Sequence, residues 1–166
     1  MAGGPPKKGT PDMLSNGVKR GLGTMKWLRL LASLCAAPIL YGVLCLPLLG
    51  WWLSFFPSKV NDLGGTFYLP LVVSIEVFQA VVLLLCGMTV ALIGGSDRWQ
   101  KVCLAAATVD MLIIGVMVQR QFWEALPVWH HWIFFLLILI MMPLGSAIIR
   151  RLRGKLVSDD AAVRLS

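Results

Sequence analysis

The residues with the greatest potential for chemistry are two acids, Glu76 and Asp110, which stand inside long apolar segments. If these segments lie in a membrane, each acid costs about 2.5 to 3.5 kcal/mol even on lenient insertion scales, so something must compensate for it. One possibility is a proton- or cation-coupled site that uses both acids. The other is polar contact that fixes helix packing, and we favour it because the apolar segments contain few other polar side chains.

The expected depth of each acid in the membrane, counted in residues from the turn, indicates a partner for it. Glu76 and Arg120 lie about equally far from the turn that joins their segments, so two antiparallel helices would bring them level and allow an ion pair. Asp110 lies near the middle of its segment, where no cation is level with it. We expect the Tyr41 hydroxyl to be its partner, with Thr108 or a backbone carbonyl as alternatives.

The histidines and cysteines lack the spacing of a metal or redox site. His130 and His131 are adjacent, so on a helix they point about 100° apart and do not easily share one metal ion. We expect an interfacial role for the pair, with proton sensing or metal binding as the alternative. No CxxC spacing occurs, and we expect neither disulfides nor a cofactor. The four cysteines all fall in apolar segments: Cys35, Cys45, Cys86 and Cys103.

Motifs that carry enzymatic chemistry are absent from the sequence. It contains no glycine-rich phosphate loop, no HExxH zinc motif and no GxSxG nucleophile motif. We therefore predict that the protein is not an enzyme and has no catalytic residues.

The elements that hold these residues follow from composition. The chain has 166 residues, 58% of them hydrophobic and 14% charged, with a mean hydropathy of +0.79. This is too apolar for a soluble domain and predicts a multi-pass integral membrane protein, an all-α four-helix transmembrane bundle. The bundle occupies residues 26–150, between a disordered basic arm (1–25) and a basic tail (151–166). Four segments are long enough to cross a bilayer: about 27–49, 67–93, 101–118 and 129–149.

The basic residues predict how the bundle is oriented. Thirteen of the fifteen lysines and arginines lie in the N-terminal arm, the turn between the second and third segments, and the C-terminal tail, leaving only Lys59 and Arg120 on the other side. Lysine and arginine near span ends are retained on the cytoplasmic side. Both termini are therefore expected to be cytoplasmic, which agrees with an even number of spans.

The net charge of +7 indicates lipid headgroups rather than nucleic acid, because the basic residues gather at the ends of spans. Cations just beyond a span gain up to about 1 kcal/mol each from anionic lipids near the surface. The simpler explanation, to which we give more weight, is that these charges only fix the topology. The predicted lipid contact consists of Arg150, Arg151, Arg153 and Lys155.

The layout resembles the MARVEL-type four-span membrane proteins. The similarity rests on both termini being inside, on the basic stretch KWLRLL at 26–31 before the first span, and on an acid, Asp110, within the third span. The sequence differs from the family pattern in its short loop over 120–131, which has no cysteines. The resemblance implies a non-enzymatic protein of vesicle trafficking, membrane apposition or microdomain organisation. Arg29 and Asp110 are the positions that carry over.

These observations together predict a membrane scaffold or accessory subunit that binds other membrane proteins or lipids and can form homo-oligomers. The small residues Gly87, Ala91 and Gly95, four apart, are typical of closely packed membrane helices. The alternative is a small proton- or cation-coupled transporter in which Asp110 and Glu76 bind the coupled ion.

Overall fold

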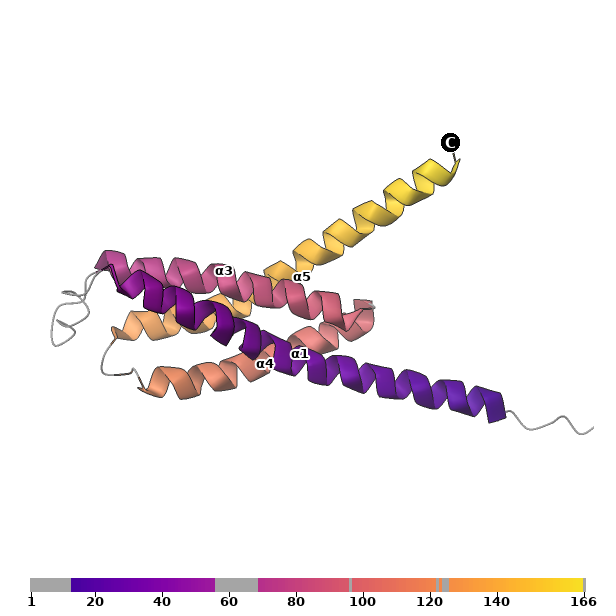
Figure 1. The fold of residues 1–166 in the computed structure, drawn as a ribbon, viewed down its shortest axis with the longest axis horizontal. Coiled ribbons are helices and arrows are strands. Elements are labelled where there is room, and N and C mark those ends of the chain that lie inside the picture. Colours follow the sequence, from indigo (N-terminus) through magenta and orange to yellow (C-terminus); the bar gives the residue numbers. More distant parts are fainter. Residues whose placement is uncertain (1–12, 56–68, 96, 122, 124–125, 166) are drawn as a thin grey trace, which may run out of the picture.

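The computed structural model is an all-α bundle whose helices run antiparallel from one to the next (Figure 1). It describes residues 13–55, 69–95, 97–121, 123 and 126–165. The predicted loop between the first two spans falls almost wholly outside this part of the chain, as do residues 1–12 of the arm. The helices are α1 (Met13–Leu53), α3 (Leu69–Gly94), α4 (Asp97–Gln121) and α5 (Val128–Leu165).

Each helix contains a segment that is long and apolar enough to cross a membrane, so the chain is a multi-pass integral membrane protein. The boundaries differ by a few residues from those predicted, mostly because the helices continue past the charged residues used to end them. The segments are Thr24–Leu48, Leu69–Gly94, Arg98–Gln121 and Val128–Leu156.

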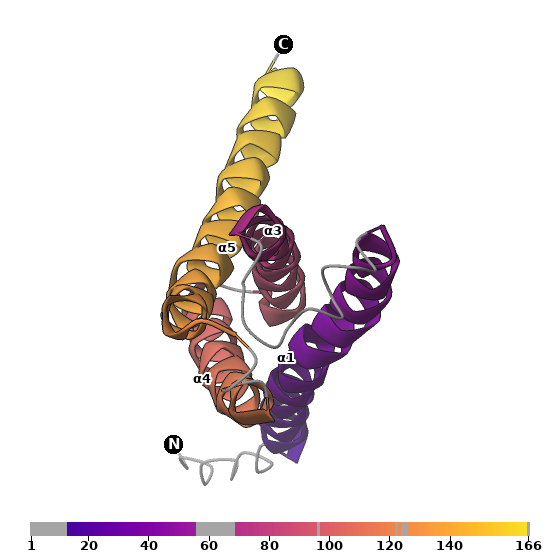
Figure 2. The same ribbon diagram turned by 90° about the vertical axis from the view of Figure 1, so that its left-hand side faces the viewer.

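The terminal helices extend beyond the bundle, which differs from the expected arm and tail. Helix α1 begins at Met13, so the second half of the arm is helical, and α5 continues to Leu165. Extending an existing helix needs no new nucleation, and the lysines, arginines and leucines of these segments are good helix formers. Both extensions leave at the end of the bundle where α3 turns into α4, and they diverge from each other (Figures 1 and 2).

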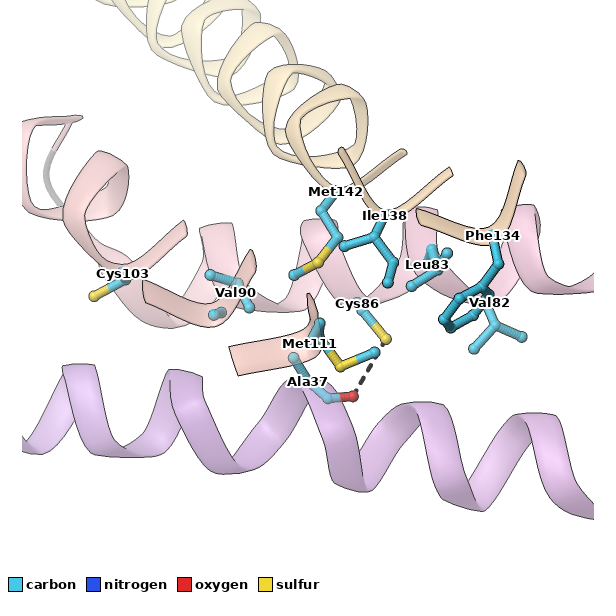
Figure 3. Packing of buried hydrophobic residues seen from close by; sticks show 11 residues of the cluster. Ala37, Val82, Leu83, Cys86, Val90, Cys103, Met111, Phe134, Ile138 and Met142 are labelled. Atoms are coloured by element: carbon cyan, nitrogen blue, oxygen red, sulfur yellow. Dashed lines mark hydrogen bonds between the residues drawn. The ribbon is translucent and has the colours of Figure 1, made fainter. Parts of the chain in front are cut away.

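Helix α3 is central, because the two most extensive helix contacts of the bundle, with α5 and with α1, both involve it. The Cys86 thiol of α3 donates a hydrogen bond to the Ala37 carbonyl of α1 at 3.4 Å, in the middle of the core (Figure 3). The buried cluster draws on all four helices: Ala37, Val82, Leu83, Cys86, Val90, Cys103, Ala107, Met111, Phe134, Ile138 and Met142.

Two glycines bring the backbones of α3 and α5 together. A Cβ added to Gly87 would overlap the carbonyl oxygen of Met142 and lie 2.7 Å from its Cα. A Cβ on Gly145 would overlap the Leu84 carbonyl and lie 2.9 Å from the Met88 nitrogen. Neither position admits a side chain without moving a helix. Such close approach lets van der Waals packing hold helices together in lipid, as the small-residue pattern predicted for Gly87.

Candidate functional site

A buried ion-pair contact joins α3 and α5 at the bundle end farther from the α3–α4 turn. Glu76 Oε1 lies 2.5 Å from His130 Nδ1, and the two residues are 7% and 1% exposed. Neither the carboxylate oxygens nor His130 Nδ1 have an aligned hydrogen-bond partner among the described residues, so the contact is one of proximity, and it is an ion pair when the imidazole is protonated. Enclosure from water makes this contact important to both residues, since an unpaired buried charge is expensive.

The second histidine makes a separate contact with α4. His131 Nδ1 donates a hydrogen bond to Gln119 Oε1 at 2.5 Å, and both side chains are buried. The Trp123 indole stacks on the His131 ring, with centroids 4.5 Å apart and planes inclined by 13°. The 100° step between consecutive helical residues therefore aims one imidazole at α3 and the next at α4. We call Glu76, Gln119, His130 and His131 the polar cluster.

The predicted Glu76–Arg120 pair is not the arrangement that the structure has. Glu76 contacts His130, and the Arg120 side chain is exposed. The depth estimate placed Glu76 level with the right part of α4, but Gln119 is the residue there that faces the interior. Arg120 is one step further round the helix and points outward, where its guanidinium can remain hydrated near the membrane surface.

Asp110 does not face its predicted partner either. It is half-buried and lines an open apolar groove of about 610 Å³ between α1 and α4, together with Leu34, Val102, Ala105, Ala106, Val109 and Ile113. Tyr41 instead borders a smaller cavity with Met111, Gly115 and Phe134. Thr108, the alternative partner, donates its hydroxyl to the Leu104 carbonyl at 2.8 Å. Within the described part of the chain, no hydrogen bond or ion pair of Asp110 is formed.

The turn between α3 and α4 is held from two sides by arginines. Gly95 has φ +76°, a conformation that glycine adopts without a steric penalty. Arg153 of α5 donates to the Gly95 carbonyl at 3.0 Å and to the Leu92 carbonyl at 3.2 Å, which satisfies acceptors that α3 leaves open at its end. From α1, the Arg29 guanidinium lies directly against the Cα of Gly95. We call Arg29, Gly95 and Arg153 the arginine turn.

The four basic residues predicted to contact lipid do not share one environment in the structure. Arg153 is half-buried and directed into the bundle, whereas Arg150, Arg151 and Lys155 are exposed. Nearby, the Trp99 indole of α4 donates to the Lys26 carbonyl of α1 at 3.0 Å. At this end of the bundle, α4 is thus joined to α1 by Trp99, and α5 is joined to the end of α3 by Arg153.

Sequence reasoning missed the buried amides. Gln100 donates to the Ser146 hydroxyl of α5 at 3.0 Å, and Gln119 bonds His131. The inward residues of α4 recur every three or four positions, a signal that could have revealed both glutamines. The stripe is Gln100, Cys103, Ala107, Met111, Gly115 and Gln119.

Among the described residues, no group of three or more histidines, cysteines, aspartates or glutamates is placed to hold a metal ion. The four cysteines are free thiols, and only Cys35 is exposed.

No protein-family model, no curated protein and no solved structure matches this chain. The four long apolar helices are consistent with a four-span membrane protein, and membership of the MARVEL-type family stays a prediction from the sequence.

Proposed function

We propose that this protein is a non-enzymatic accessory subunit or scaffold, which binds a transmembrane helix of another membrane protein in the groove between α1 and α4. One observation carries the proposal. Asp110 is a carboxylic acid in an apolar, membrane-facing groove, and no partner for it lies within the described part of the chain.

An acid in this position favours a partner helix with a basic or hydrogen-bond-donating side chain at the same depth. When Asp110 faces lipid alone, no described residue of this chain compensates for its removal from water. A lysine, arginine or histidine from the partner would supply that compensation. The small side chains of Ala105 and Ala106 beside Asp110 let another helix approach closely.

We also propose an orientation for the bundle in the membrane. Basic residues of three helices gather near the α3–α4 turn: Lys26, Arg29, Arg98 and Arg153. Lysines and arginines at span ends are retained on the cytoplasmic side of a membrane. We place both termini, and the helical extensions of α1 and α5, in the cytoplasm.

A transporter that uses both acids together is less well supported. Glu76 is enclosed against His130 of α5, whereas Asp110 borders the groove between α1 and α4. Two acids that line different parts of the bundle do not form one ion-binding site. The Asp110→Asn variant separates the two functions, because a carrier coupled through this acid would lose its pH-dependent flux in proteoliposomes.

Site-directed photo-crosslinking in native membranes tests the docking groove. A photoreactive phenylalanine analogue at Ala106 should give a discrete adduct with another membrane protein, and the same probe at exposed Leu139 of α5 serves as the control. The adduct should disappear in Asp110→Leu and persist more strongly in Asp110→Asn, which can still form a hydrogen bond. Crosslinks to lipid alone, crosslinks to a second copy of this chain, or adducts unchanged in Asp110→Leu would contradict the proposal.

If a discrete protein is captured, charge exchange identifies the contact. The Asp110→Lys variant should lose the adduct, and replacing the basic residue of the partner span by aspartate should restore it. If replacing each basic residue of that span by aspartate, one at a time, never restores the adduct, an ionic contact at Asp110 is contradicted.

A further inference from the structure

Two guanidinium groups from different helices converge on one residue at the basic end of the bundle. Arg29 of α1 lies against the Cα of Gly95, and Arg153 of α5 bonds the carbonyl oxygen of the same residue. Two cations brought this close repel each other unless an anion lies nearby.

The two arginines use their donors differently. Arg153 directs both terminal nitrogens to backbone carbonyls, at 3.0 and 3.2 Å. The guanidinium of Arg29 forms no hydrogen bond or ion pair with a described residue. Within the described part of the chain, its planar fork of donors is not used by any other residue.

The position of Arg29 indicates which anion is at hand. Arg29 lies just inside the first span, which begins at Thr24, and its side chain reaches the turn that follows the end of the second span at Gly94. Trp99, which bonds the Lys26 carbonyl, is typical of the membrane interface. Phospholipid phosphates lie at this depth, and a guanidinium binds phosphate through two parallel hydrogen bonds.

We propose that the arginine turn is a binding site for the phosphate of an anionic phospholipid, with Arg29 as the direct ligand and Arg153 as the residue that holds the turn beneath it. The exposed side chains of Lys26, Arg98 and Lys101 add positive charge at the same end of the bundle. This site depends on α1, α3 and α5, and is separate from the groove at Asp110.

Native mass spectrometry of the full chain tests the site. The protein is released from micelles that contain phosphatidylglycerol or phosphatidylcholine, and the retained lipids are counted. We expect one phosphatidylglycerol to survive conditions that remove every phosphatidylcholine. Arg29→Gln should weaken its apparent affinity by about 10-fold or more, because a charge-assisted contact is lost. Arg29→Lys should fall between the two, since lysine keeps the charge without the fork.

Arg151→Gln is the matched control, because it removes the same charge from an exposed position at the same end of the chain. It should retain the tightly bound lipid. Equal losses in Arg29→Gln and Arg151→Gln, or equal retention of phosphatidylcholine, would show a diffuse charge effect and overturn the proposal. If Arg29→Gln does not fold, the phosphatidylglycerol preference of the native chain and the Arg29→Lys variant still decide.

Inorganic phosphate distinguishes a lipid from a soluble ligand. At matched ionic strength, phosphatidylglycerol should raise the melting temperature of the native chain, and sodium phosphate should not. An equal rise with sodium phosphate would overturn the lipid assignment. Asp110→Leu should leave the lipid result unchanged, so failure of the docking groove and failure of this site are distinguishable.

Discussion

The carboxylate of Glu76 on α3 lies 2.5 Å from the imidazole Nδ1 of His130 on α5, and both side chains are enclosed by the bundle. The contact lies well away from Gly87 and Gly145, toward the other end of the α3–α5 interface. Helix α5 is thus joined to α3 by polar contact at one level and by backbone packing at another.

Removing one member of this pair should destabilise the protein strongly. Glu76→Ala leaves His130 buried without its partner, and we expect a loss of about 3 to 5 kcal/mol in the free energy of unfolding. Glu76→Gln should cost less, because an amide of the same size leaves no cavity and keeps a polar group beside the imidazole. Reversible denaturation in detergent micelles measures both. Arg120→Gln, at an exposed cation of α4, should have little effect, and a loss as large as that of Glu76→Ala would contradict the pairing.

The contact between α4 and α5 should depend on Gln119. Gln119→Leu leaves His131 Nδ1 without its acceptor in a buried site, and we expect a loss of about 1 to 3 kcal/mol. The exposed Gln121 supplies the control substitution Gln121→Leu on the same helix. Equal stability of the two variants would mean that the amide contact contributes nothing.

A side chain at Gly87 should separate α3 from α5. Gly87→Val places methyl groups where the Met142 backbone lies, so the helices must move apart or the bundle must unfold. We expect a lower melting temperature in detergent. Gly42→Ala in α1 is the matched control, because no atom lies within 4 Å of the added Cβ, and its melting temperature should stay the same or rise. A tolerant Gly87→Val variant would refute the close approach of the two backbones.

The turn at Gly95 should reject any side chain. Gly95→Ala forces a left-handed backbone conformation on alanine, at a cost of about 1 to 2 kcal/mol, and its methyl group displaces the Arg29 guanidinium. We expect a loss of stability at least that large, measured by denaturation in micelles. Gly154→Ala in α5 meets nothing within 4 Å and should not show it.

The membrane spans could be predicted from the sequence because the bilayer sets the length of an apolar helix. Which face of each helix points inward could not be predicted as well, because lipid-facing residues are as apolar as buried ones. Arg120 and Asp110 illustrate the difference. Each is next to an inward residue of α4, Gln119 and Met111, so an error of one position changed the expected partner. Depth followed from counting residues, whereas direction depended on how α3, α4 and α5 pack.

The termini illustrate a second limit. Composition made residues 1–25 look like a disordered arm, yet Met13 already begins α1. Glycine, serine and asparagine in this segment weaken an isolated helix, but the first span supplies the nucleus from which the helix extends. The composition of residues 1–25 by itself does not show that a stable membrane helix follows them.

The glycine contacts between α3 and α5 divide the bundle into a fixed and an adjustable half. Where main chain rests on main chain at Gly87 and Gly145, no rotamer change can absorb a displacement. Helix α1 contacts α3 and α4 through side chains and borders the open apolar groove between α1 and α4. An incoming helix would therefore be accommodated by a tilt of α1. Because α1 is one continuous helix from Met13, a tilt of its membrane span would also move the end of the helix that protrudes from the bundle.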